Sequence, residues 1–521
     1  MESAIKQADV IIIGAGPTGL SLACQLIRYG VDFIIIDKSE GVTAYSKALG
    51  VHARTLEIYE QLGIAEKAVS QGIIAGKVRM LANAKVRGEA DFSSMGKGLS
   101  QYPYMLLLEQ SKNERLLYDY MQTHGKDVLW HTELVSFLQA DTTVTAQVKT
   151  ISGNLTIEAK YLVACDGPKS PVRHGLGLEF EGSTFERTFY VADVRVDWPF
   201  PHDALHICLA RSSGIAFFPM SGENRYRIIG AFPEGFDKNE GEALYEEIEQ
   251  HIKHESSINL DISQVNWFST YKVHTRHVER FSSGRCFLAG DSAHVHTPAG
   301  GQGMNTGIQD AYNLAWKLAF VLQGKANVKI LESYNQERLK NAKHLVQSTD
   351  RMFNLISSSN WLIKLMRSVV MPCLVQHIIN LKSVRNSFFP FISQIGISYR
   401  DSDLSRHEGD EQFVVKAGDR MPYFLVDGAS IYDKLQEPKF HLISFTNDFQ
   451  ITKNEIKGDY ENVLDCQTLL LCSEVTTIFA TDKPFTVLLR PDNYIGFIFS
   501  GISLDTLDIY LKQNIGYSNF L

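Results

Sequence analysis

The stretch that decides the fold is DVIIIGAGPTGLSLACQLIRYGVDFIIID, residues 9–37. It opens with the continuous apolar, β-branched run Val10–Ile13, which is typical of a buried parallel strand. A glycine motif follows at residues 14–19, and then a helical pattern that stops at Gly30. A second apolar run, Phe33–Ile36, completes the pattern. This order predicts a strand–helix–strand unit.

The glycine motif in this unit predicts a dinucleotide site. Gly14 permits the tight turn, Gly16 lets the backbone approach a pyrophosphate, and Gly19 lets the helix pack on the strand. The helix start would offer free N–H groups and partial positive charge to the phosphates. Asp37, 18 residues after Gly19, is placed to accept a hydrogen bond from an adenosine ribose. The motif alone does not separate NAD from FAD.

A second glycine-rich stretch, LAGDSAHVHTPAGGQGMNTGIQDAYNLAWKLA (residues 288–319), allows three interpretations. His294 and His296 could supply two metal ligands, but no Cys or carboxylate cluster lies nearby at useful spacing, so we expect no metal. A nucleotide-triphosphate loop is excluded because G-x-x-x-x-G-K-[ST] is absent. The third interpretation is a strand ending at Asp291, a glycine loop, and a helix start near Gly303 aimed at the negative edge of a reduced flavin. We favour the third, which indicates FAD.

The bulk composition describes a globular protein of more than one domain, with 521 residues, 44% hydrophobic and 21% charged. The net charge of −8 and the lack of a Lys/Arg run argue against nucleic acid as a partner. The N-terminus lacks signal-peptide character, and the most apolar later stretch, residues 362–381, is broken by charges and a proline, so we expect no membrane span. Seven scattered cysteines favour the cytoplasm and no disulfide framework.

The second glycine-rich stretch strongly resembles the fingerprint of the class A flavoprotein monooxygenases, the FAD-dependent aromatic hydroxylases of the para-hydroxybenzoate hydroxylase type. That family has patterns close to G-D-A-A-H, P-x-G-G-Q-G-x-N and D-A-x-N-L-A-W-K-L. This chain has GDSAH, PAGGQGMN and DAYNLAWKL within residues 290–318. CDGPKSPVR (165–173), SKALGVHARTLE (46–57) and LLLEQSKNERLL (106–117) resemble further family segments, although Lys47 stands where many relatives have Arg.

Two C-terminal segments, AGDRMPYFLV and VLLRPDNYIGFI, look like the thioredoxin-like domain of the phenol hydroxylase and polyketide-oxygenase branch of that family. We therefore expect an α/β (α+β) fold, in which a Rossmann-like FAD-binding domain carries an inserted antiparallel-sheet substrate domain and a small thioredoxin-like domain ends the chain. The expected boundaries are 1–175 with 284–345 for the discontinuous FAD-binding domain, 176–283 for the substrate domain, 346–404 for a helical segment and linker, and 405–521 for the C-terminal domain.

The resemblance implies a single-component monooxygenase that uses FAD, NADH or NADPH, and O2. Its expected reaction is hydroxylation of an aromatic or polyketide-like small molecule through a flavin C4a-hydroperoxide. A flavin-dependent epoxidase or reductase of the same fold, and a non-catalytic FAD-binding protein, stay open as alternatives. The expected partners are the aromatic substrate, O2 and a second copy of the chain in a homodimer.

The resemblance and the motifs together give the expected site residues. Those predicted to bind the cofactor are Gly14, Gly16, Pro17, Thr18, Gly19, Asp37, Lys38, Lys47, Gln110, Leu134, Asp166, Gly167, Asp291, Gly301, Gly303, Met304 and Asn305. Among them, Asp291 is expected on the ribityl chain and Gly303–Asn305 at the pyrimidine edge. Pro298 and Gly301 are predicted to form the catalytic loop beside the flavin ring.

The substrate wall is the least constrained part of the expected site. We predict it at Phe217, Phe218, Pro219 and Met220, with ordinary sheet core as the alternative. Three arginines could meet an anionic substrate, although structural or exposed roles are favoured for them; they are Arg211, Arg225 and Arg227. His294 could relay a proton, but a buried structural role is favoured.

Overall fold

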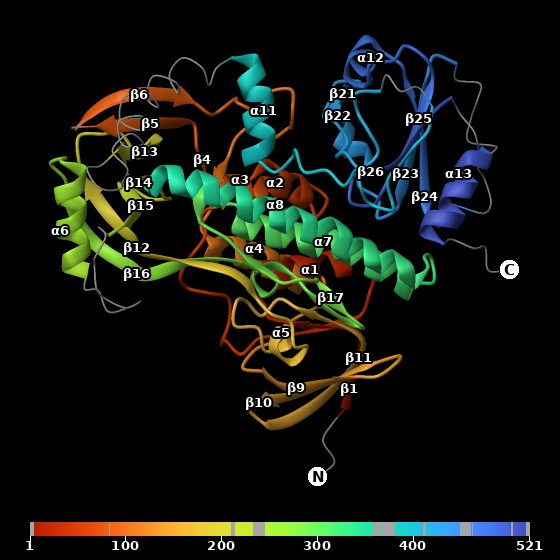
Figure 1. The fold of residues 1–521 in the computed structure, drawn as a ribbon, viewed down its shortest axis with the longest axis horizontal. Helices are drawn as coiled ribbons and strands as arrows, with labels where there is room; N and C mark the ends of the chain where they lie inside the picture. The colour runs from red at the N-terminus through yellow and green to blue at the C-terminus, as the bar shows by residue number, and fades with distance from the viewer. Residues whose placement is uncertain are drawn as a thin grey trace.

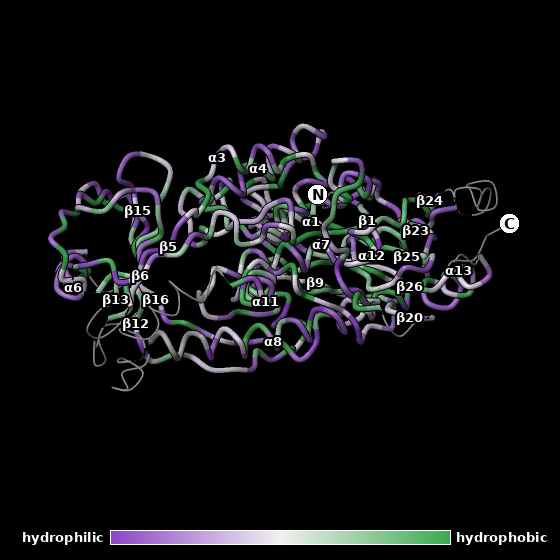
Figure 2. The backbone as a smooth tube through the Cα atoms, turned by 90° about the horizontal axis from the view of Figure 1, so that it is seen from above, coloured by the Kyte–Doolittle hydropathy of each residue, from purple (hydrophilic) through white to green (hydrophobic). Residues whose placement is uncertain are grey.

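The structure of the protein, a computed structural model, has three regions arranged along its longest axis. An antiparallel sheet lies at one end, a parallel sheet with its helices in the middle, and a small C-terminal domain at the other end (Figures 1 and 2). The predicted α/β fold class is confirmed. The structure describes residues 5–82, 84–209, 214–232, 245–357, 366, 381–409, 413–448, 460, 462–501 and 504–516.

The middle region confirms the predicted strand–helix–strand unit. Strand β1 pairs in parallel with β2 and β11, and β11 pairs in parallel with β18. The two glycine-rich stretches follow β1 and β18, so both begin at the carboxyl ends of the strands of one sheet. The strands of this sheet are β1 (Ile5–Ile13), β2 (Phe33–Ile36), β8 (Val128–Leu129), β9 (Glu133–Gln139), β10 (Val144–Thr150), β11 (Gly153–Ala164), β17 (Ser282–Ser283) and β18 (Cys286–Leu288).

Helix α1 (Pro17–Arg28) packs against α7 (Gly303–Leu322) and α4 (Gln110–Thr123). Proline suits the first turn of α1, and Gly30 adopts the left-handed φ of +67° that ends it. Every residue of α7 from Asn305 to Phe320 is buried, so this helix is the centre of the core. The remaining helices are α2 (Ala53–Glu60), α3 (Ala65–Gln71), α5 (Pro171–Gly175), α6 (Tyr245–Ser256), α8 (Glu332–Ser357), α11 (Lys382–Ile392), α12 (Ser473–Phe479) and α13 (Leu504–Tyr510).

The second sheet is antiparallel over most of its width, as predicted for residues 177–283. Two of its strands come from residues 77–91, inside the range that the sequence assigns to the FAD-binding domain, and β5 pairs in parallel with β13. The strands are β5 (Lys77–Ala82), β6 (Lys85–Asp91), β12 (Glu181–Asp197), β13 (Ala204–Leu209), β14 (Gly214–Pro219), β15 (Arg225–Ala231), β16 (Asp261–His277) and β19 (His294–Val295). A three-stranded sheet of β3 (Gly50–Val51), β4 (Ile73–Ile74) and β7 (Leu106–Leu107) completes the N-terminal part.

The C-terminal domain is a mixed sheet with its own apolar core. Its strand β23 pairs in parallel with β24 and antiparallel with β25, in keeping with the expected thioredoxin-like fold. Its strands are β20 (Arg406–His407), β21 (Leu425–Val426), β22 (Ala429–Ser430), β23 (Phe440–Thr446), β24 (Leu464–Leu470), β25 (Phe485–Leu489) and β26 (Ile495–Ser500).

Two further observations concern the described residues alone. Their six cysteines are all free thiols. Among their helices, none combines the length and the apolar character that crossing a membrane requires.

Candidate active site

The first glycine motif has the geometry that a pyrophosphate needs. A Cβ atom on Gly19 would lie 1.9 Å from the carbonyl oxygen of Gly14, so helix and strand pack too closely for any other residue. A Cβ atom on Gly16 would meet nothing within 4 Å, so this glycine borders open space. Gly16 is also the N-cap of α1, with no side-chain cap and no acidic residue in the first turn. The partial positive charge of the helix start is therefore available to an anion.

Asp37 follows β2 and is fixed beside this motif. Its carboxylate accepts hydrogen bonds from the backbone N–H groups of Ala15 (2.7 Å) and Ser39 (2.8 Å). A carboxylate has further lone pairs, so a ribose hydroxyl can still donate to it. Of the neighbours predicted with it, Lys38 is exposed and Leu134 is buried on β9.

The second glycine-rich stretch meets the first one at Gly290. This residue adopts a φ of +64° in a short 3₁₀ turn, Gly290–Ser292, and a Cβ atom on it would lie 2.5 Å from the Oγ1 atom of Thr18. The N–H group of Gly290 donates to Asp310 on α7 (2.9 Å). The two loops thus form one continuous cradle.

Asp291 lies on the wall of this cradle. Its side chain is exposed, yet desolvation by the surrounding protein raises its pKa, against the positive charges of His294 and Lys47. A carboxylate in that position can accept a hydrogen bond from a hydroxyl group, as the ribityl prediction for Asp291 requires.

Gln110 holds the loop that carries Lys47. Its Oε1 atom accepts hydrogen bonds from the backbone N–H groups of Lys47 (3.2 Å) and Ala48 (3.1 Å), and its Nε2 atom donates to Glu114 (2.8 Å). The amide of Gln110 is therefore engaged within the protein. The Lys47 side chain stays exposed and close enough to influence Asp291.

The segment CDGPKSPVR (residues 165–173) forms another side of the cradle. Burial raises the pKa of Asp166 to about 6, and its Oδ1 atom is buried without a hydrogen-bond partner within the described residues. Gly167 adopts a φ of +80°. Arg173 donates to the carbonyl oxygens of Ser292 (3.2 Å) and Pro168 (2.8 Å), which joins this motif to the second glycine-rich stretch. An unpartnered buried carboxylate oxygen beside such a cradle fits a bound polar group.

The loop expected beside the flavin ring runs from Pro298 into α7. Pro298 and Gly301 are exposed, and α7 starts without a side-chain cap or an acidic residue in its first turn. The Asn305 side chain makes four hydrogen bonds within the protein, to Gly50, Gly301, His52 and Thr55. Met304 accepts a hydrogen bond from Asn113 at its sulfur atom (3.4 Å). The groups that α7 leaves for a cofactor are therefore the backbone N–H groups of its first turn, starting at Gly303.

The two histidines of this stretch have internal partners. His294 is buried, and its Nε2 atom lies 2.8 Å from Asp310. The Nδ1–H group of His296 donates to the carbonyl oxygen of Thr297 (2.8 Å), and burial lowers the pKa of His296 to about 4. Across the described ranges, no three His, Cys, Asp or Glu residues are grouped so as to hold a metal ion.

The predicted substrate wall divides between the two faces of β14. Phe217 is fully buried and packs against Trp198, with ring centroids 4.5 Å apart, in the core that includes α6. Phe218 and Met220 lie on the opposite face, in the cluster of Leu49 and Leu107 from the FAD-binding region, while Pro219 is buried at the end of the strand.

The candidate arginines are accounted for by structural contacts where they are described. Arg227 is buried in a bidentate ion pair with Asp193, with N–O distances of 2.7 and 2.8 Å, and Arg225 donates to the carbonyl oxygen of Ser221 (3.1 Å). Arg211 lies outside the described residues.

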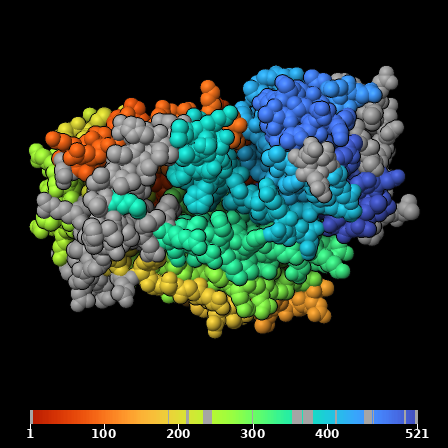
Figure 3. Space-filling model, turned by 45° about the horizontal axis from the view of Figure 1, so that its top comes forward, coloured from red at the N-terminus to blue at the C-terminus, as the bar shows by residue number. Residues whose placement is uncertain are grey.

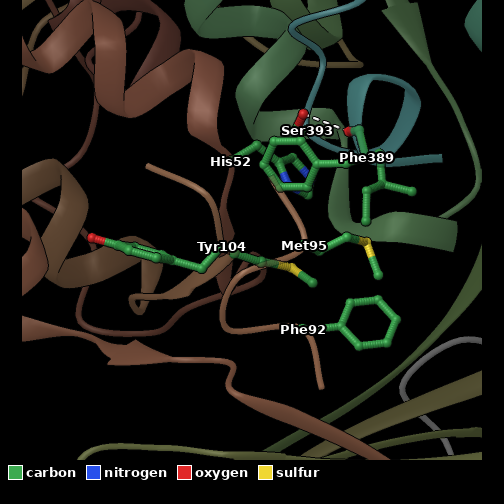
Figure 4. Close-up of a pocket in the computed structure, with 8 residues that line it drawn as sticks. His52, Phe92, Met95, Tyr104, Phe389 and Ser393 are labelled. Carbon is green, nitrogen blue, oxygen red and sulfur yellow. Dashed lines mark hydrogen bonds between the residues drawn. The ribbon is translucent and has the colours of Figure 1, made fainter. Parts of the chain in front are cut away.

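A pocket that the sequence did not indicate adjoins the flavin loop (Figure 4). The Nε2 atom of His52 lies 2.9 Å from the carbonyl oxygen of Gly300; because a carbonyl only accepts, this nitrogen carries the proton. Burial lowers the pKa of His52 to about 4, so its ring is neutral at pH 7. The lining residues come from segments far apart in sequence: His52, Phe92, Met95, Tyr104, Met105, Phe389, Ile392 and Ser393. No single motif contains this set, so sequence patterns could not reveal it.

Comparison with known proteins agrees with this geometry. The model of the FAD binding domain family matches residues 7–349. The chain is 31% identical over 450 residues to a 6-methylpretetramide 4-monooxygenase of Streptomyces rimosus, covering 84% of this chain and 80% of that protein. It is 28% identical to a rifampicin monooxygenase of Rhodococcus hoagii, covering 98% and 99%. Among solved structures, an anhydrotetracycline hydroxylase from Streptomyces rimosus is similar, with a TM-score of 0.77, 27% identity and coverage of 98% and 99%.

Proposed function

We propose that this chain, which belongs to the FAD binding domain family and is an FAD-dependent monooxygenase, hydroxylates a planar, largely apolar aromatic or polyketide-like molecule. In this proposal the residues that line the small pocket of Figure 4 form one wall of the substrate site. One observation carries the proposal. The hydrogen bond between His52 and Gly300 joins the pocket to the loop that precedes α7. A ligand that contacts the residues lining this pocket would therefore lie close to the flavin ring for which that loop is predicted.

The chemistry of the pocket lining supports this substrate class. Three aromatic side chains, those of Phe92, Tyr104 and Phe389, contribute flat apolar surface, and Met95 and Met105 add flexible, polarisable contacts. Among the described residues that line the pocket, none is Lys, Arg, Asp or Glu. Such a surface favours a neutral ring system over a small charged acid.

The residues of the cradle supply positioning. When bound, FAD accepts hydride from NADH or NADPH and activates O2. In our proposal, Gly16 and the start of α1 hold the pyrophosphate, and Asp291 holds the ribityl chain. The free N–H groups at the start of α7 stabilise negative charge on the pyrimidine edge. Pro298 and Gly301 cover the ring and exclude water from it.

Several expectations from the sequence belong to the same proposal. The FAD-binding domain is residues 1–175 with 284–345, except that residues 77–91 join the substrate sheet, most of which residues 176–283 form. O2 is the second substrate, the protein acts in the cytoplasm, and two copies associate as a homodimer. Residues 405–521 form a separate C-terminal domain.

The test is NADH and NADPH oxidation by the FAD-loaded enzyme, with a panel of tetracyclines, anthraquinones, rifamycins and simple phenols. We expect the polycyclic compounds to stimulate oxidation and to give products that gain one oxygen atom. The variant Phe389→Ala should raise the KM for the best substrate by about tenfold, which corresponds to the loss of about 1.4 kcal/mol of aromatic contact. Its neighbour Phe388 is half-buried but does not line the pocket, so Phe388→Ala is the matched control. Equal KM values for the two variants, or products without added oxygen, would overturn the proposal.

A further inference from the structure

Among the contacts between the C-terminal domain and the core of the FAD-binding region is a buried loop that follows β25. Arg490 forms a bidentate ion pair with Glu337 on α8, with N–O distances of 2.5 and 3.1 Å, and both side chains are buried. Lys317 on α7 donates to the same glutamate (2.8 Å). Asp492 accepts a hydrogen bond from the indole N–H of Trp316 (3.1 Å). The loop therefore contacts both α7 and α8. In Figure 3 the C-terminal region lies directly against the surface of α8.

This cluster continues toward the cofactor cradle. The guanidinium of Arg490 lies over the ring of Tyr399, 5.3 Å from its centroid. The Tyr399 hydroxyl accepts a hydrogen bond from Arg338 (2.8 Å), and Arg338 also donates to Asp310 (2.6 Å). Asp310 in turn accepts a hydrogen bond from the backbone N–H group of Gly290, the residue before Asp291. A continuous chain of contacts thus runs from the C-terminal domain to the cradle wall.

Burial makes this network of contacts rigid. Glu337, Arg338, Arg490 and Asp310 are all at most 3% exposed, so any of them left without its partner would be an uncompensated charge in the interior. Burial opposes ionisation of Glu337, but Arg490 and Lys317 hold its pKa well below its usual range. Such a network has few alternative arrangements, so a displacement at one end is transmitted to the other.

We propose that the C-terminal domain is a positioning element of the flavin site, which fixes the Gly290–Asp291 backbone through Tyr399, Arg338 and Asp310. The proposal rests on FAD binding and does not depend on the substrate. It assigns a role to a domain that has no C-x-x-C motif and lies outside the matched family region.

A pair of neighbouring tyrosines, whose rings are tilted by 40° to each other, allows a matched test. Tyr399 and Tyr494 have ring centroids 4.3 Å apart, and both are buried. Arg338 donates to the Tyr399 hydroxyl, whereas the Tyr494 hydroxyl has no hydrogen-bond partner within the described part of the chain. Tyr399→Phe therefore removes one hydrogen bond from this series of contacts. Tyr494→Phe removes the hydroxyl group of the neighbouring ring, which is not part of the series.

The measurements are the Kd of FAD for the apoprotein, the visible circular dichroism of bound flavin, and the thermal midpoint of the apoprotein. We expect Tyr399→Phe to raise the Kd by about 2- to 30-fold, the usual range of coupling through packed networks, and to alter the flavin spectrum. Tyr494→Phe should change neither. Equal Kd values and spectra for the two variants would overturn the proposal, even if Tyr399→Phe lowered the thermal midpoint, because a purely structural contact affects stability alone.

Discussion

The substitution Gly16→Ala separates cofactor binding from folding. Gly16 has φ −73° and ψ −174°, which alanine adopts without strain, and its Cβ atom would meet nothing within 4 Å. Alanine lowers the entropy of the unfolded chain but is a poorer N-cap than glycine, and each effect is at most about 1 kcal/mol. The free energy of unfolding of the apoprotein should therefore change by less than about 1 kcal/mol.

The same methyl group would occupy the space that Gly16 leaves for the pyrophosphate. It would hold the phosphates away from the backbone N–H groups at the start of α1, where no side chain provides a cap. A hydrogen bond to a charged group is worth about 1.5–3 kcal/mol. The loss of one such bond corresponds to an increase of about 10- to 150-fold in the Kd of FAD.

Two assays check this prediction. Urea unfolding of the apoprotein gives the stability, and titration of the apoprotein with FAD, followed by flavin fluorescence, gives the Kd. An alanine variant that bound FAD as tightly as the wild type would refute our reasoning, because the open side of Gly16 would then not face the phosphates. A large decrease in the free energy of unfolding of the apoprotein would refute the claim that alanine fits at this position without strain.

Three further predictions concern stability, each measured by urea unfolding of the apoprotein. Gly19→Ala should cost about 1–3 kcal/mol, because its Cβ atom would lie 1.9 Å from the Gly14 carbonyl oxygen; an unchanged midpoint would contradict this clash. Burial raises the pKa of Asp166 to about 6, so wild-type stability should fall relative to Asp166→Asn as pH rises from 4 to 7, and parallel pH curves would be contrary evidence. Arg490→Met should cost about 3–5 kcal/mol, because it leaves Glu337 buried without its main partner, and Glu337→Gln in the same chain should recover part of the loss.

The cofactor half of the site could be predicted from sequence because its chemistry is local. The close contact at Gly19, the open side of Gly16 and the position of Asp37 all follow from one strand–helix–strand unit. The turn at Gly290 and the helix start at Gly303 likewise lie within a single stretch of 32 residues, 288–319. Where neighbours in sequence are neighbours in space, residue type and spacing are sufficient.

The substrate half depends on contacts between distant segments. The pocket brings His52, from the segment 46–57, together with Phe389 from α11. The antiparallel sheet includes residues 77–91, whose strand β5 pairs with β13. Phe217 and Phe218 are adjacent in sequence but lie on opposite faces of β14. The apolar stretch IAFFPM (residues 215–220) therefore does not indicate which face of the strand lies toward the flavin. Tyr399 lies in the range 346–404, which the sequence predicts as a helical segment and linker, yet it is buried and its hydroxyl accepts a hydrogen bond from Arg338.

The family pattern D-A-x-N-L-A-W-K-L shows how a motif can be recognised correctly while its purpose is hidden. We identified Asp310, Asn313, Trp316 and Lys317 through their resemblance to a flavin fingerprint. In the structure these polar side chains bind Arg338, Glu337 and Asp492, three residues from α8 and the C-terminal domain. The sequence does contain a signal for this arrangement. Asp310, Asn313 and Lys317 recur three or four positions apart, along one face of a helix that is buried from Asn305 to Phe320. Buried polar groups need partners, so such a face predicts a second polar element packed against it. Here that element is α8, which supplies Glu337 and Arg338, together with the loop from Arg490 to Asp492.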